Sequence, residues 1–197
     1  MWQIRIHGRG GQGVVTAAEL LSVAAFRQGL HAQAFPSFGS ERTGAPVVAF
    51  CRLADAPIRT HDPISSPDAV IVQDVTLLAG VDVLSGLAPA GYVLLNTSHA
   101  PADLGLGDVV AALPPGHVRT VPATDLALAH VGRALPNVPL LGAFAALTGW
   151  VTIDAVAAAI AERFAGPVAQ RNIAAAEAAH ALVATPVPTE VDHAPAG

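Results

Sequence analysis

The residues with the clearest chemical potential lie near the start of the chain, where four glycines fall within six positions. The segment reads Gly8-Arg9-Gly10-Gly11-Gln12-Gly13, with the spacing G-x-G-x-x-G. Between a strand and a helix, such a turn directs backbone N–H groups and the positive end of the helix dipole toward an anion. The chemistry expected here is therefore the binding of a phosphate or another anionic group. Alternatively, the glycines serve only the backbone geometry and close packing of a tight turn.

The residues on both sides of the glycines predict the two elements that such a turn requires. Ile4 and Ile6 alternate with polar residues before the glycines, which is typical of a β-strand. Residues 14–26 follow the glycines and predict a helix. Its apolar stripe includes Leu20, Leu21, Ala24 and Ala25.

A nicotinamide site is disfavoured by the residues that follow this helix. Such a site uses an acidic residue roughly 20 positions after the glycines to bind a ribose hydroxyl. Residues 31–35 predict the second strand, and no acidic residue occurs there before Glu41. A standard NAD site is therefore not expected.

A second segment of interest lies between the predicted strands 31–35 and 47–53. Residues 36–46 combine proline, glycine and hydroxyl residues with Glu41 and Arg42, a composition typical of a loop. We expect this loop to lie beside the glycine turn, because both would lie at the carboxyl ends of neighbouring strands, where open α/β sheets bind ligands. An ordinary surface connection is the alternative.

The remainder of the chain predicts more strands and then a helical C-terminal part. Further strands are predicted at 68–74, 91–98 and 117–122, and helices at 76–87, 123–135, 140–149, 153–164 and 167–184. Asn96, Thr97 and Ser98 end one strand, where they can contact a ligand or cap the following turn. Thr124 or Asp125 is expected to be the N-cap of the helix that begins near residue 123.

Length and composition predict one α/β domain over residues 1–184, followed by a mobile tail over 185–197. The chain has 197 residues, 52% of them hydrophobic, and the tail contains three prolines and no apolar period. No apolar run has the length of a membrane span, and the N-terminus does not have the pattern of a signal peptide. A cytoplasmic protein without membrane contact is therefore expected.

Several classes of site are excluded by residues that the chain lacks. All ten basic residues are arginine, so a Walker A lysine, a Schiff-base lysine and a pyridoxal phosphate site are absent. The single cysteine, Cys51, excludes an internal disulfide and a multi-cysteine metal or iron–sulfur site within this chain. The net charge of −5 and the lack of a basic cluster argue against nucleic-acid binding.

Two long motifs identify a family. Residues 8–21 and 33–46 closely resemble the gamma subunit of pyruvate and related 2-oxoacid:ferredoxin oxidoreductases, which also occurs as a domain of single-chain pyruvate:ferredoxin oxidoreductases. The resemblance continues in short matches to about residue 183, at 72–74, 96–98, 122–127, 137–142 and Asn172. One departure is Arg42-Thr43-Gly44, where many members carry Arg-Arg-Gly or Gln-Arg-Gly.

The resemblance implies a doubly wound, mostly parallel, Rossmann-like α/β domain that acts as a non-catalytic subunit. The family's complex decarboxylates a 2-oxoacid, transfers the acyl group to coenzyme A and passes two electrons through iron–sulfur clusters to ferredoxin or another acceptor. Thiamine diphosphate and Mg are implied on the alpha and beta partner subunits, and [4Fe-4S] clusters on the beta or delta subunit. This chain alone is expected to bind no cofactor and to contribute no catalytic residue, with coenzyme A nearby as a substrate.

The resemblance also implies where a ligand or partner lies. The glycine turn and the following loop are expected near coenzyme A or near the interface with the alpha and beta subunits. The candidate binding residues are Gly8, Arg9, Gly10, Gly11, Gln12, Gly13, Ser37, Phe38, Gly39, Arg42, Asn96 and Thr97. Arg9 and Arg42 are candidates to bind phosphate or partner carboxylates through their forked donors.

Two alternatives to this role stay open. The chain could be a free-standing nucleotide-binding module that acts as a sensor or scaffold. It could also be the small subunit of an indolepyruvate oxidoreductase, although that relative usually lacks the pattern seen at 35–41.

Overall fold

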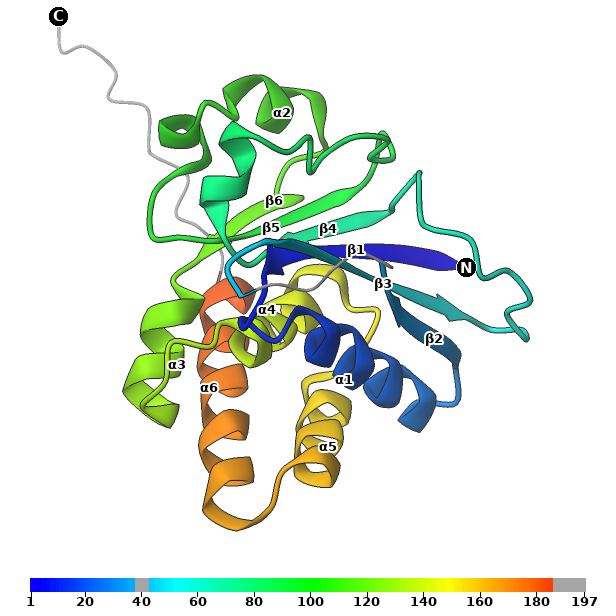
Figure 1. Ribbon diagram of the computed structural model, residues 1–197, viewed down its shortest axis with the longest axis vertical. Coiled ribbons are helices and arrows are strands. Elements are labelled where there is room, and N and C mark those ends of the chain that lie inside the picture. The colour runs from blue at the N-terminus through cyan, green and yellow to red at the C-terminus, as the bar shows by residue number, and fades with distance from the viewer. Residues whose placement is uncertain (38–42, 186–197) are drawn as a thin grey trace, which may run out of the picture.

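A six-stranded sheet forms the centre of the computed structural model, which describes residues 1–37 and 43–185 (Figure 1). The strand order is β2-β3-β1-β4-β5-β6. The strands are β1 (Trp2–Arg9), β2 (His31–Pro36), β3 (Pro46–Ala54), β4 (Ala69–Val72), β5 (Tyr92–Asn96) and β6 (Val118–Val121). Three candidate residues, Phe38, Gly39 and Arg42, lie outside the described residues, as does the predicted tail beyond Thr185.

The sheet is mostly parallel, with an antiparallel part at one side. β1, β4, β5 and β6 run parallel to one another, whereas β3 is antiparallel to both β1 and β2. After β1 the chain forms β2 and β3 on one side of β1 in the sheet, and it then crosses to form β4 on the other side of β1. The carboxyl ends of β1 and β4 therefore flank the point where the strand order reverses, the usual ligand position in such sheets.

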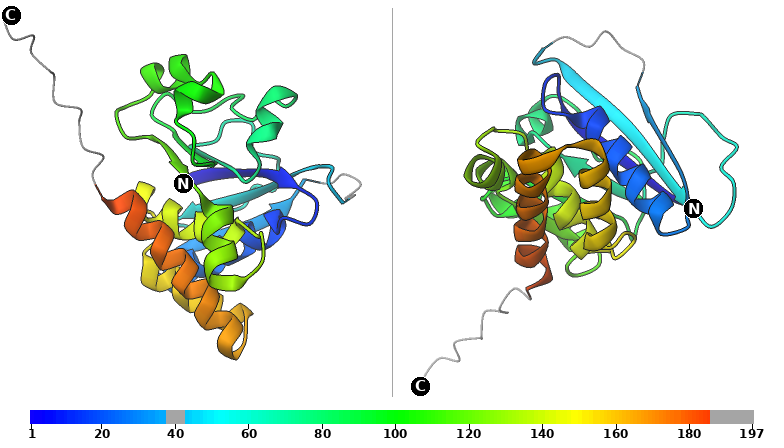
Figure 2. Two further views of the ribbon diagram at one scale, coloured as in Figure 1. Left: turned by 90° about the vertical axis from the view of Figure 1, so that its left-hand side faces the viewer. Right: turned by 90° about the horizontal axis from the view of Figure 1, so that it is seen from below.

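Four long helices cover one face of the sheet (Figures 1 and 2). They are α1 (Val14–Arg27), α4 (Asn137–Thr148), α5 (Ile153–Arg163) and α6 (Gly166–Ala184), with α3 (Ala123–Val131) beside α6. Together with the sheet they enclose the larger hydrophobic core. The α/β class and the helical C-terminal part are thus confirmed.

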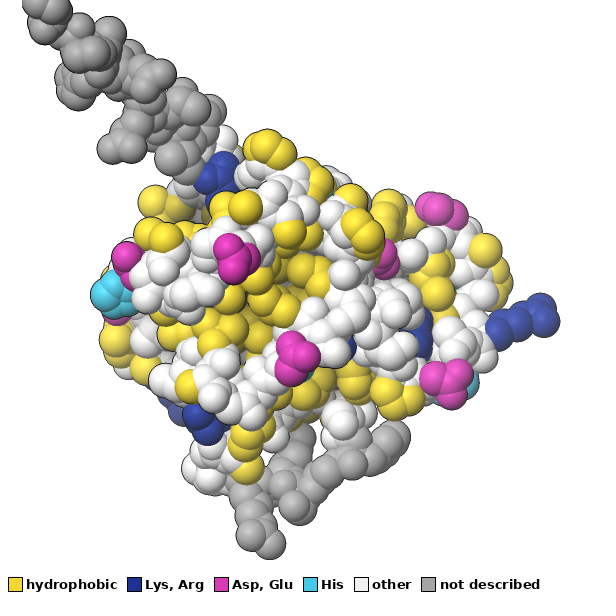
Figure 3. Space-filling model, turned by 90° about the horizontal axis from the view of Figure 1, so that it is seen from above, with side chains coloured by type: hydrophobic (Ala, Val, Ile, Leu, Met, Phe, Trp, Pro, Cys, Tyr) yellow, Lys and Arg dark blue, Asp and Glu magenta, His cyan; other side chains and the backbone are white. Residues whose placement is uncertain are grey.

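The opposite face has a thinner cover. Over β4 and β5 it consists of the 3-10 helices η1 (Val75–Ala79) and η2 (Pro101–Leu104) and the short helix α2 (Gly107–Ala112). Hydrophobic side chains gather across the centre of this side of the molecule (Figure 3). Helices therefore lie on both faces of the sheet, but the two layers differ greatly in thickness.

The connection between β3 and β4 covers the other half of this face without regular secondary structure. Side chains of the sheet donate hydrogen bonds to backbone carbonyls of this connection. Arg5 donates to the carbonyl of Ile64, and Arg52 donates to that of Asp62. Arg5 and Arg52 are buried, so the segment shields polar side chains of the sheet.

Helix α4 lies at the centre of the helical layer. Every residue from 137 to 145 is buried, so the helix has no solvent-facing polar stripe. Gly142 permits a close contact with α6, because a Cβ atom at this position would lie 1.9 Å from the carbonyl oxygen of Ala176. This glycine sets the distance between the two helices.

Two expectations for local structure were wrong, and one short helix was not predicted. Residues 76–87 form only the 3-10 helix η1 followed by turns, because Asp74 caps a tight first turn and Gly80 ends it. Helix α3 begins at Ala123, so neither Thr124 nor Asp125 is its N-cap. Helix α2 was not predicted, since its six residues have no apolar period.

Within residues 1–37 and 43–185, no helix combines the length and the apolar character needed to cross a membrane.

Candidate functional site

The glycine turn joins β1 to α1 through backbone conformations that require glycine. Gly11 and Gly13 have φ values of 96° and 74°, in the left-handed region that favours glycine. A Cβ atom at Gly8 would lie 2.6 Å from Cγ2 of Val14, and one at Gly13 would lie 2.5 Å from Nδ2 of Asn137. Backbone geometry and close packing therefore account for three of the four glycines, whatever the turn binds.

The same turn leaves a set of backbone donors without acceptors. Among the described residues, none accepts a hydrogen bond from the N–H groups of Gly11, Gly13, Val14, Val15 or Thr16. The N-cap, Gly13, has no side chain to cap the helix, and the first turn of α1 contains no acidic residue. Free N–H groups at the positive end of a 14-residue helix form a favourable position for an anion.

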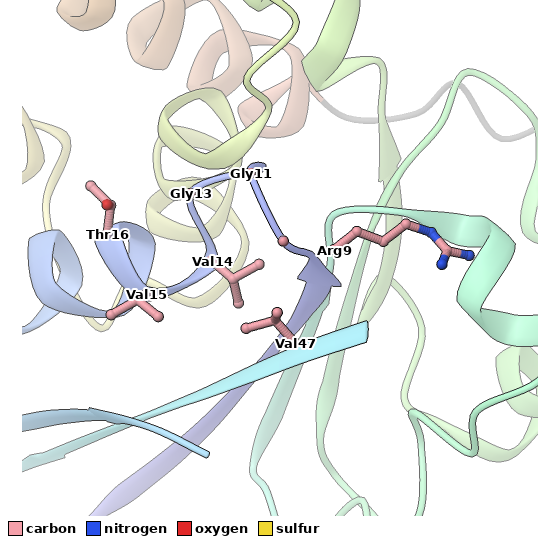
Figure 4. Close-up of a pocket in the computed structure, with 8 residues that line it drawn as sticks. Arg9, Gly11, Gly13, Val14, Val15, Thr16 and Val47 are labelled. Carbon is pink, nitrogen blue, oxygen red and sulfur yellow. The ribbon is translucent and has the colours of Figure 1, made fainter. Parts of the chain in front are cut away.

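A surface pocket of about 320 Å³ adjoins these donors. Its lining residues are Arg9, Gly10, Gly11, Gly13, Val14, Val15, Thr16 and Val47. In Figure 4 the side chains of Val14 and Val47 face one another below the glycine backbone. The pocket thus combines peptide donors with an apolar wall.

Arg9 extends away from this apolar wall (Figure 4) and binds groups of its own chain. Its Nε donates to Oδ2 of Asp74 at 3.0 Å, and Nη2 donates to Oγ1 of Thr76 at 2.7 Å. Nη1 donates to the carbonyl oxygen of Gly44 at 3.1 Å. The guanidinium of Arg9, which was predicted to bind phosphate, therefore donates its hydrogen bonds to acceptors of its own chain.

Asp74 is the shared acceptor of this network. Gln12 donates from Nε2 to Oδ2 of Asp74 at 3.2 Å and accepts the N–H of Arg9 at 2.7 Å. Desolvation raises the pKa of the Asp74 carboxyl, but hydrogen bonds from Thr76 and Gln12 and the charge of Arg9 outweigh it and lower the pKa. The ionised carboxylate therefore fixes the turn from the end of β4.

Asp74 is not among the binding residues that were predicted from the sequence. The available signal was its position, since it follows a buried apolar strand at the carboxyl end of the sheet. Only the pairing of β4 with β1 shows that this end lies beside the glycine turn.

The described part of the second loop lies beside the glycine turn, as expected, but for a different reason. The N–H of Gly10 donates to the carbonyl of Ala45 at 2.9 Å, and that of Gly44 donates to the carbonyl of Gly10 at 3.1 Å. The loop leaves the carboxyl end of β2, but β3 lies between β2 and β1, so residues 44 and 45 reach the turn from the amino end of β3. The side chain of Ser37 is exposed, and its N–H donates to the carbonyl of Val48.

Asn96 and Thr97 lie one strand further away and make the hydrogen bonds of caps. Oδ1 of Asn96 accepts the N–H of Thr124 at 3.1 Å, at the start of α3, and Nδ2 donates to the carbonyl of Gln73 at 2.8 Å. Oγ1 of Thr97 accepts the N–H of His99 at 3.1 Å. Ligand contact and capping were the two roles predicted for these residues, and these hydrogen bonds match capping. The bond from Asn96 to Gln73 also joins the ends of two neighbouring strands.

Comparison with known proteins bears out the resemblance found in the sequence. A family model described as pyruvate ferredoxin/flavodoxin oxidoreductase matches residues 3–182. The chain is 48% identical to pyruvate synthase subunit PorC of Methanothermobacter thermautotrophicus, over 91% of this chain and 94% of that protein. It is 46% identical to the pyruvate/ketoisovalerate oxidoreductases common subunit gamma of Thermococcus kodakarensis, over 91% and 95% of the two chains.

Solved structures share the fold. The pyruvate oxidoreductase subunit PORC of Thermotoga maritima superimposes with a TM-score of 0.77 at 34% identity, over 91% of this chain and 95% of that chain. The 2-oxoglutarate:ferredoxin oxidoreductase of Magnetococcus marinus, solved with 2-oxoglutarate, coenzyme A and succinyl-CoA bound, gives a TM-score of 0.73. At 17% identity, over 92% of this chain and 31% of that one, this second likeness shows the fold alone.

The match to the family model over residues 3–182 includes the glycine turn and, apart from Trp2, all six strands. The chain therefore belongs to the pyruvate ferredoxin/flavodoxin oxidoreductase family, among its gamma-type subunits.

Proposed function

We propose that this chain is the non-catalytic gamma subunit of a thiamine diphosphate-dependent 2-oxoacid:ferredoxin, or other acceptor, oxidoreductase, and that its glycine turn binds part of coenzyme A. The observation that carries the proposal is the group of free backbone N–H donors beside the pocket at the start of α1. Binding at this turn would hold coenzyme A for acyl transfer or control its access to the partner subunits.

The pocket suits a ligand with anionic and apolar parts. Coenzyme A carries phosphate groups and a long pantetheine arm that has no charge. The N–H groups of residues 13–16 can bind a phosphate, and the wall of Val14, Val15 and Val47 can contact a less polar part of the ligand. The pocket therefore offers backbone N–H groups to the phosphates of coenzyme A and an apolar wall to its uncharged arm.

The cofactors of the reaction belong to partner subunits in this proposal. A [4Fe-4S] cluster needs several cysteine thiolates, whereas this chain has Cys51 alone. Burial raises the pKa of the Cys51 thiol, which disfavours the thiolate that binds a metal. Alpha and beta subunits are therefore expected to hold thiamine diphosphate and Mg, and a beta or delta subunit is expected to hold the clusters.

A charge substitution in the pocket tests coenzyme A binding. Thr16→Glu places a carboxylate beside the free N–H groups, where it suits the helix dipole but repels an anionic ligand. In the assembled complex we expect the KM for coenzyme A to rise about tenfold or more, with unchanged assembly. Ser22→Glu adds the same charge on α1 outside this pocket and should leave the KM unchanged.

Equal coenzyme A kinetics in both variants would overturn the binding proposal. Affinity purification of the chain with co-expressed neighbours tests the subunit role separately. Stoichiometric recovery of thiamine-binding and iron–sulfur subunits is expected. A chain that elutes alone would instead support the free-standing nucleotide-binding module.

A further inference from the structure

The side chain of Gln73 is buried without hydrogen-bond partners. The residue is 1% exposed, and neither Oε1 nor Nε2 has a partner among the described residues. Its backbone, in contrast, is paired: the N–H donates to the carbonyl of His7 at 2.7 Å, and the carbonyl accepts Nδ2 of Asn96. Buried amides in proteins nearly always make hydrogen bonds to protein groups or to ordered water.

Gln73 lies directly beneath the glycine turn. Ala69 and Ile71 contribute to the core on the helix-covered face, and strand alternation places Gln73 on that face as well. A Cβ atom at Gly8 would lie 3.2 Å from Cβ of Gln73 and 2.6 Å from Cγ2 of Val14. Gln73 and Val14, the first residue of α1, therefore both border Gly8, where an added Cβ atom would collide.

The pocket and the buried amide are separate features. Gln73 is not among the residues that line the pocket, whereas Val14 lines the pocket and, like Gln73, borders Gly8. A ligand in the pocket therefore would not touch Gln73. Any effect of Gln73 on the ligand must pass through the backbone of the turn.

The chemistry of the amide indicates which group completes it. Oε1 needs a donor and Nε2 needs acceptors, and each atom has too little accessible surface to meet bulk solvent. Water is the smallest group that both donates and accepts, and internal waters commonly bind otherwise unpaired polar groups. The backbone of Gln73 lies beside the turn, since a Cβ atom at Gly8 would lie 3.2 Å from Cβ of Gln73.

We propose that Gln73 binds an internal water molecule beneath the glycine turn and, through it, positions the turn for its ligand. Gln73 is thus a positioning residue, not a catalytic one. The water completes the hydrogen bonds of the amide beside Gly8, so that the turn keeps the backbone orientation that the ligand needs. The positioning role rests on the proposed binding of coenzyme A at the turn.

Two measurements test this proposal in the assembled complex. A crystal structure of the complex at about 2 Å resolution should show a water within hydrogen-bond distance of Oε1 or Nε2 of Gln73. Gln73→Met removes both polar atoms at similar length and should raise the KM for coenzyme A about tenfold, equivalent to about 1.4 kcal/mol. The kcat at saturating coenzyme A should change much less than the KM.

Matched variants separate positioning from packing. Ile71→Met changes a buried side chain on the same strand and face without changing polarity, and it should leave the KM for coenzyme A unchanged. Gln73→Asn keeps both amide atoms on a shorter side chain and should give a KM between those of the wild type and Gln73→Met. If Gln73→Met does not assemble, the wild-type electron density and Gln73→Asn still decide the matter.

Two results would overturn the inference: no water at Gln73 in the wild-type complex, or the same KM in Gln73→Met and Ile71→Met. The proposed function fails independently, if Thr16→Glu leaves the KM unchanged. An increased KM in Thr16→Glu together with an unchanged KM in Gln73→Met would leave coenzyme A binding in place and remove only the role of Gln73.

Discussion

Arg5 donates a hydrogen bond from Nε to Nε2 of His7 at 3.0 Å, and both side chains are buried on the thinly covered face of the sheet. The bond requires a neutral imidazole nitrogen, because a protonated ring has no acceptor. Desolvation and the charge of Arg5 lower the pKa of His7 from its ordinary value of 6.5 to about 4. The backbone carbonyls of Val83 and Ser85 accept further hydrogen bonds from the guanidinium.

This pair predicts a loss of stability in mild acid. The unfolded chain protonates His7 near pH 6.5 and the folded chain only near pH 4, so the unfolded state binds more protons between these values. The contribution is fully present above pH 6.5 and is lost as the pH falls to about 4. It amounts to about 3 kcal/mol of unfolding free energy.

Urea unfolding of the purified chain between pH 7.5 and 4.5 measures this effect. His7→Gln keeps an acceptor for Arg5 without a titrating group, so its stability should vary much less over the same range. An equal pH dependence in the variant and the wild type would assign the acid sensitivity to other groups.

Asp74→Asn is expected to loosen the glycine turn. The substitution removes the charge that holds Arg9 and weakens the acceptor of Gln12, while it keeps the shape of the side chain. Because Arg9 is partly exposed, the stability should fall by only about 1 kcal/mol or less. The KM for coenzyme A should rise roughly threefold to tenfold, as a less ordered turn binds an anion less well.

Asp108→Asn is the control for this substitution, since it removes an exposed charge from α2, away from the turn. Steady-state kinetics of both complexes at varied coenzyme A concentration decide the matter. A normal KM in Asp74→Asn would show that Arg9 and Gln12 do not shape the binding site.

Gly142→Ala should disrupt the packing of α4 on α6. The added Cβ would lie 1.9 Å from the carbonyl oxygen of Ala176, a backbone atom that cannot turn aside. We expect a loss of about 3 kcal/mol or more, measured as a lower unfolding midpoint, despite the higher helix propensity of alanine.

Gly107→Ala is the matched control, because it also replaces a helical glycine by alanine but has open space at the Cβ position. It should be neutral or stabilising by roughly 0.5–1 kcal/mol. Similar midpoints for the two variants would mean that α4 and α6 can separate at little cost.

Gly13→Ala should be destabilising for two separable reasons. The residue has φ 74°, which costs a non-glycine residue roughly 1–2 kcal/mol, and its Cβ would collide with Nδ2 of Asn137. Asn137→Ala removes the collision but not the backbone strain. The double variant should therefore be more stable than the sum of the single changes predicts, and exact additivity in urea unfolding would show that the two residues are not coupled.

The sequence by itself determined the class of fold, the glycine turn and the family. Local patterns suffice for these features: Ile4 and Ile6 alternate as a strand requires, and the spacing of Gly8, Gly10 and Gly13 specifies a turn before a helix. The three long C-terminal helices, α4, α5 and α6, were also predictable, because alanine-rich segments have strong helix propensity and their predicted boundaries differ only slightly from those observed.

Tertiary structure alone decided which residues surround the turn. The antiparallel pairing of β3 places residues 43–45 against Gly10, and the parallel pairing of β4 brings Asp74 to Arg9 across 65 positions of sequence. The buried position of Gln73 depends equally on these pairings. Strand order and direction result from the packing of whole elements, and side-chain periodicity within one segment contains no information about which strand will become its neighbour.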